Sequence, residues 1–250
     1  MTQQSAYIRY RASVRLFDLV QQYIDGMEQP QPKPDVDVLV QAMDLFVKES
    51  VETFVLQPAA HIGLKPAYLK MINSLSKLTE KSAMMLVNKV AKKMSLEDHR
   101  NAAQYMQQVR LTYEENDELV GDIIFPIRAN FAEIGWSTRE KMLNGYAKDP
   151  QVLQEGISFL HEVIDVANLW VFEKPVELLN LGPVMRKLAV STVSTVKKAT
   201  HSLINTLVPK ISEAQTIASA EYFSDIVGPG PFSQEYGLIP EPFIAMRMAR

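Results

Sequence analysis

The side chains that most often bind metals or transfer protons are sparse in this sequence. It contains four histidines and no cysteine, which excludes thiolate ligands, disulfides and a cysteine nucleophile. A carboxylate di-iron site in a helical protein requires Glu-x-x-His on two helices. None of His61, His99, His161 and His201 has a glutamate three residues before it. The sequence therefore predicts no metal site and no cofactor.

His161 and Asp165 are the local pair best placed for chemistry, because residues four apart lie on the same face of a helix. They could share a proton or supply half of a metal site. The simpler interpretation is a polar pair on a solvent-exposed face. A catalytic or ligand-binding role predicts an internal pocket beside these two residues, and a filled core predicts none.

Other catalytic motifs are missing or have a plainer explanation. There is no Gly-x-Ser-x-Gly and no glycine-rich phosphate loop. Asp35 and Asp37 are better explained as first-turn acids that complement a helix dipole than as ligands. Asp117, Glu118 and Asp122 are interpreted as a solvated acidic face. We therefore predict no catalytic residues.

Positive charge is concentrated in two segments. Residues 65–95 contain seven lysines and one acid, Glu80, and residues 183–208 contain four basic side chains and no acid. Both segments have the apolar periodicity of amphipathic helices. Between them, residues 96–180 contain 15 acidic and seven basic side chains. The candidate binding residues on the two basic faces are Lys70, Lys77, Lys81, Lys89, Lys92, Lys93, Arg186, Lys187, Lys197 and Lys198.

These basic faces have several possible partners. They could neutralise the acidic segment within the fold or between subunits, or one of them could face an anionic surface. Nucleic acid is disfavoured, because the basic side chains are nearly all lysine and stacking aromatics are scarce. A lipid surface suits lysines beside Leu, Met and Val, although Trp and Phe anchors are missing from both segments.

Helical periodicity dominates the chain, and we find no alternation typical of strands. The sequence predicts helices over about 5–24, 35–58, 66–94, 150–172, 183–208 and 211–227, with a fourth helix starting at Ser95 and a short one ending near Gly145. The fold class is therefore all-α, a single antiparallel multi-helix bundle over residues 1–228. Residues 29–34, QPQPKP, form a proline-rich linker inside it.

Residues 229–250 differ from the rest, with prolines separating large apolar side chains. We predict an extended tail that either wraps its own bundle or docks into the groove of a partner. Its candidate docking residues are Phe232, Tyr236, Leu238, Ile239, Phe243 and Met246.

Taken together, these features favour a non-enzymatic, cytoplasmic interaction or scaffold protein that assembles with itself or with a protein partner. The first alternative is a protein that binds a lipid or membrane surface peripherally through its basic helices. A bundle that binds a small apolar ligand is the second, because the 12 methionines could adapt to an irregular cavity. The N-terminus lacks the apolar core of a signal peptide, and no apolar run reaches the length of a spanning helix.

Overall fold

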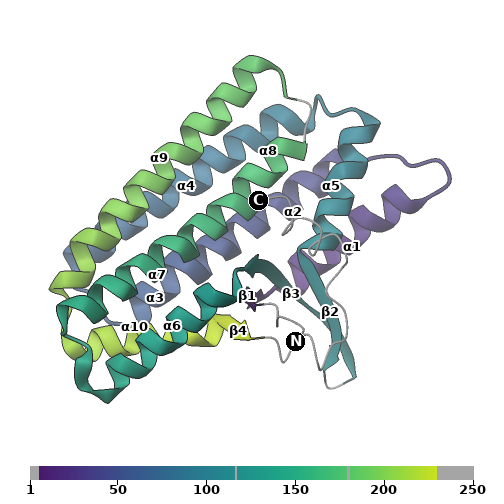
Figure 1. Ribbon diagram of the computed structural model, residues 1–250. Helices are drawn as coiled ribbons and strands as arrows, with labels where there is room; N and C mark the ends of the chain where they lie inside the picture. Colours follow the sequence, from purple (N-terminus) through teal and green to yellow (C-terminus); the bar gives the residue numbers. More distant parts are fainter. Residues whose placement is uncertain (1–5, 116, 179–180, 230–250) are drawn as a thin grey trace.

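A computed structural model describes residues 6–115, 117–178 and 181–229 (Figure 1). The helical elements are α1 (Val14–Glu28), α2 (Val36–Val51), η1 (Glu52–Leu56), α3 (Gln57–His61), α4 (Pro66–Ala91), α5 (Leu96–Gln108), α6 (Ala129–Lys141), η2 (Met142–Tyr146), α7 (Pro150–Asn168), η3 (Leu169–Glu173), α8 (Lys174–Leu178), α9 (Pro183–Leu207), η4 (Val208–Lys210) and α10 (Glu213–Ile226). The strands are β1 (Ala6–Arg11), β2 (Arg110–Glu115), β3 (Glu118–Ile127) and β4 (Val227–Pro229).

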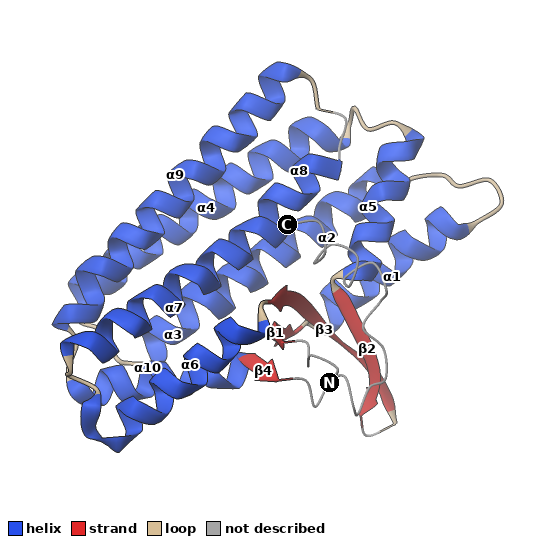
Figure 2. Ribbon diagram, in the orientation of Figure 1, coloured by secondary structure: helices blue, strands red, loops and turns tan. Residues whose placement is uncertain are grey.

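The mostly helical character predicted from the sequence is confirmed, and a small sheet is added to it (Figure 2). The strand order is β2-β3-β1-β4, and every pair in it is antiparallel. The long helices α4, α7 and α9 lie side by side, and the sheet lies to one side of them, next to α1, α6 and α7 (Figure 1). One main hydrophobic cluster includes residues from Ala6 to Val227, so sheet and helices share a core.

The helix predicted from residue 5 to residue 24 is wrong in its first half. Residues Ala6–Arg11 form β1, and α1 begins only at Val14, with Ser13 as its N-cap. Ile8 and Tyr10 point into the core from one face of β1. Their two-residue spacing is the period of a strand, so the apolar pattern in this segment fits a strand as well as it fits a helix. Pairing with β3, more than a hundred residues away in the chain, decides for the strand.

The chain that follows α5 contains strands, although the sequence showed no alternation typical of strands. Residues 110–127 form the hairpin of β2 and β3, in which Glu115 pairs with Glu118. Asp117, in the turn, has a φ of 64°, the left-handed conformation that two-residue hairpin turns require. Asp117, a residue type that tolerates this conformation, was therefore a turn signal in the sequence. The solvated acidic face predicted here is wrong for Asp122, which is buried.

Several helix boundaries follow the sequence signals. Ser95 and Asp98 form a capping box at the start of α5, and Asp149 caps α7 directly before Pro150. Pro183 opens α9 as expected. The short helix expected before Gly145 is longer than a capping-box pattern at Ser137 in the sequence suggests, because Ser137 lies inside α6.

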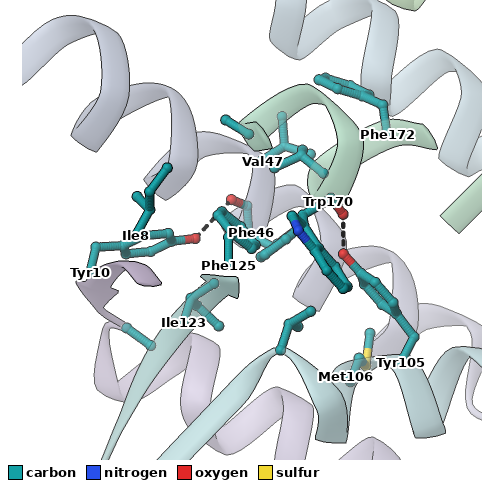
Figure 3. Close-up of a cluster of buried hydrophobic side chains, with 14 of the residues drawn as sticks. Ile8, Tyr10, Phe46, Val47, Tyr105, Met106, Ile123, Phe125, Trp170 and Phe172 are labelled. Atoms are coloured by element: carbon teal, nitrogen blue, oxygen red, sulfur yellow. Dashed lines mark hydrogen bonds between the residues drawn. The ribbon is translucent and has the colours of Figure 1, made fainter. Parts of the chain in front are cut away.

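Aromatic side chains join the sheet to the helices (Figure 3). Phe125 of β3 is fully buried, and its ring centroid lies 6.0 Å from that of Phe54 and 6.5 Å from that of Trp170. Phe54 and Trp170 belong to the π-helical turns η1 and η3, which place both side chains over the same strand. Tyr105 stacks on the far side of Trp170 and donates a hydrogen bond to its carbonyl oxygen.

Candidate functional site

The exposed face of α4 combines positive charge with an apolar row. Lys70, Lys77, Lys81 and Lys89 on α4 and Lys92 and Lys93 just after it are all exposed. Within the described residues, none of the six forms an ion pair with an acid.

The apolar row on this face consists of Met71, Leu78 and Met85, which are 49%, 46% and 39% exposed. Their spacing of seven residues places them on one line along the helix. The opposite side of α4 is buried through Ile72, Ala83 and Leu86. We call the exposed row together with the six lysines the α4 face.

The basic side chains of α9 have different environments. Arg186, Lys187 and Lys198 are exposed, whereas Lys197 is half-buried and its Nζ lies 2.8 Å from Oδ2 of Asp165 on α7. Lys197 therefore neutralises an acid of the segment 96–180 within the fold, as one of the alternatives for the basic faces proposed. The six lysines of the α4 face remain available to bind an anionic partner.

His161 and Asp165 lie beside α9 rather than beside an internal pocket. The rings of His161 and His201 are stacked, with centroids 4.1 Å apart and planes 7° apart, and His201 Nε2 lies 2.8 Å from Oδ1 of Asp165. Parallel stacked rings direct their nitrogens into separate planes instead of toward a common point. In the described part of the chain, no group of three or more His, Cys, Asp or Glu side chains could hold a metal ion.

We expect the protein to lose stability as the pH falls from 7.5 to 5.5. Burial, then the neighbouring His201, lower the pKa of His161 below its ordinary 6.5, although Asp165 and Asn205 act the other way. Burial also lowers the pKa of His99, whose Nδ1 lies 2.6 Å from the hydroxyl of Tyr23. Because both groups bind protons more readily in the unfolded chain, unfolding is favoured below the ordinary histidine pKa.

Urea denaturation at pH 7.5, 6.5 and 5.5 measures this effect, above the pH range in which carboxylates titrate. A His161→Asn variant should lose less stability over the same interval than the wild type does. Stability that is constant or rises toward pH 5.5 would contradict the prediction.

The sequence did not single out a polar cluster on the sheet. Oδ1 of the buried Asp122 accepts hydrogen bonds from Arg11 Nε at 2.9 Å and from the Tyr113 hydroxyl at 3.1 Å, and Oδ2 lies 3.4 Å from Arg9 Nη1. Arg11 also binds Glu115 at 2.8 Å. Because the acid is fully occupied by strand neighbours, the cluster fixes the register of β1, β2 and β3. The alternation of Arg9 and Arg11 in the sequence was the signal from which this polar cluster could have been found.

An apolar cavity of about 100 Å³ lies between α2, α4, α5, α8 and α9. Its wall contains three methionines, Met43, Met94 and Met106, and further aliphatic side chains with Phe172. The one polar side chain in the wall, Tyr105, uses its hydroxyl to bind Trp170. His161 and Asp165 do not line this cavity, so it is not the pocket that a catalytic or ligand-binding role for these two residues predicts.

The predicted docking residues of the tail, from Phe232 to Met246, lie outside the described residues. Of the predicted tail, Pro229 is described, and it pairs with Ala6 at the edge of the sheet. Among the helices described, none has the length and hydropathy needed to cross a membrane. Comparison of the chain with protein-family models, curated proteins and solved structures finds no match.

Proposed function

We propose that this protein works by binding, and that its α4 face docks on an anionic lipid surface. The observation that carries the proposal is the exposed row of Met71, Leu78 and Met85, with Lys77 and Lys81 beside it and no acid paired to these lysines in the described structure. Helices that lie in a membrane interface combine these two features, an apolar row that enters the acyl boundary and lysines that reach anionic headgroups.

The arrangement favours lipid over the other partners considered. Two copies of the chain that met through this face would bring a dozen lysines together, and like charges at that distance repel. Nucleic acid would use the lysines but would leave the apolar row unburied. An acidic protein could cover both features, and it is the partner that a scaffold role would require.

Flotation of the purified protein with vesicles tests the proposal. We expect it to float with phosphatidylcholine vesicles that contain phosphatidylserine, to stay at the bottom with pure phosphatidylcholine, and to be released by high salt. Each lysine near an anionic surface contributes about 1 kcal/mol, so a Lys77→Glu/Lys81→Glu variant should bind at least about tenfold more weakly.

Two further variants separate the contributions. Met71→Ser/Leu78→Ser should also weaken binding, because it removes the apolar contact without changing the charge. Arg15→Glu/Lys33→Glu makes the same charge change at two exposed positions, on α1 and in the linker after it, and should bind like the wild type. Circular dichroism verifies that all variants are folded.

The proposal fails if the wild type does not float, or if both double charge variants lose binding equally. An absence of flotation, together with salt-sensitive binding to an acidic protein through the α4 face, would replace it with the scaffold role.

A further inference from the structure

We propose that the apolar cavity binds the hydrocarbon chain of a single-chain anionic amphiphile, whose carboxylate or phosphate head lies at the N-terminus of α9. This site shares Lys92 and Lys93 with the α4 face, but its cavity and the N-terminus of α9 lie outside that face, and it does not depend on the function proposed for the face. Different residues would bind the chain and the head.

The wall of the cavity accepts only hydrocarbon. The sole hydroxyl in it already donates to the Trp170 carbonyl, so a polar group placed inside would lose its hydrogen bonds to water without replacement. Apolar cavities of this order of size in other proteins bind small hydrocarbons. Met43, Met94 and Met106 can adjust their side chains to a ligand of varying length.

Basic residues of two helices lie next to residues that line the cavity. The lining includes Ala91, the last residue of α4, Met94 three residues later, and Leu181 two residues before α9. Lys92 and Lys93 stand between Ala91 and Met94 in the sequence, and Arg186 stands in the first turns of α9. α4 and α9 run antiparallel, so Lys92 and Lys93 lie at the same end of the molecule as Arg186 (Figure 1).

The N-terminus of α9 supplies further positive potential. Gly182, its N-cap, has no side chain that could accept a hydrogen bond from the first turn, and Arg186 and Lys187 follow within that turn or just after it. An anion there is stabilised by the N–H groups and by the helix dipole. Glu177 of α8 is already bound to Lys174 at 2.8 Å. Arg186 and Lys187, both exposed, therefore supply charge that complements an anionic head.

Isothermal titration calorimetry with decanoate and decyl phosphate below their micelle concentrations, and with decanol below its solubility limit, tests this site on the full chain. We expect saturable binding of one anionic amphiphile per chain and at least tenfold weaker binding of decanol. The tighter of the two anions identifies the head, carboxylate or phosphate.

Two variants assign the contacts. Ala102→Leu fills the cavity from a half-buried position on α5, and excluding about two methylenes of the ligand should weaken binding about tenfold. Arg186→Gln/Lys187→Gln changes only exposed side chains, so it should fold normally, weaken both anions and leave decanol unchanged. Lys198→Gln, at an exposed position farther along α9, is the matched control and should bind like the wild type.

Equal binding of decanol and decanoate, an unaffected Ala102→Leu variant, or no saturable binding to the wild type would each overturn the proposal. Because the ligands are monomeric, these results are independent of whether the protein floats with vesicles.

Discussion

Replacing Phe125 with alanine is expected to lower the free energy of unfolding by about 3–5 kcal/mol. Phe125 is fully buried, and its ring contacts Phe46, Phe54 and Trp170, which come from three different helical elements. The cavity left by the substitution is surrounded by large rings that are held by other contacts and cannot collapse into it. Urea denaturation followed by far-ultraviolet circular dichroism measures the loss.

Val14→Ala is the matched control for this substitution. Val14 is 78% exposed in the first turn of α1, so its truncation should change stability by no more than about 0.5 kcal/mol. A loss below about 1 kcal/mol for Phe125→Ala would mean that the sheet and the helices do not share the core described above.

Gly135→Ala is expected to destabilise the protein by about 2 kcal/mol, although alanine is the better helix former. A Cβ atom at Gly135 of α6 would lie 2.2 Å from the ring of Phe159. That ring is buried and stacks on Phe131 with centroids 5.0 Å apart, so it has little room to move. The overlap outweighs the gain of about 1 kcal/mol in helix propensity.

Two other glycines in helices make the comparison decisive. At Gly156 of α7 the nearest atom to a new Cβ is the terminal methyl of Met142, at 2.9 Å, which a flexible side chain can withdraw. At Gly26 of α1 no atom lies within 4 Å, so Gly26→Ala should stabilise the protein by about 0.5–1 kcal/mol. Thermal unfolding of the three variants should rank them with Gly26→Ala highest and Gly135→Ala lowest. A Gly135→Ala variant as stable as the wild type would contradict the packing described for Phe159.

Local signals were sufficient for most helices and insufficient for the sheet. The N-caps Ser95 and Asp149 and the opening Pro183 act on the residues next to them, so their effect is readable in a short window. β1 forms because Ile8 and Tyr10 find partners in β3, and nothing near residue 8 in the chain records that partner.

The candidate sites also differ in how much of each could be predicted from the sequence. The exposure of the lysines on α4 follows from the period of that helix and could be predicted. The pairing of Lys197 with Asp165 joins two helices, and the apolar cavity is lined by residues from six of the described helical elements, η3 among them, so both depend on the tertiary arrangement. Pairing of Asp122 with Arg9 and Arg11 likewise required the strand register.

The pairing of β1 with β4 has a consequence for the synthesis of the chain. β1 leaves the ribosome before the other described elements, but its partners follow later, β3 near the middle of the chain and β4 near the end of the described residues. Non-local strand pairing is slow because the intervening chain must be ordered first. During translation, α2 and α4 can associate while β1 still has an unpaired edge, and such an edge is open to other chains. Its two arginines reduce that risk, since charge on an unpaired strand opposes association with a second copy.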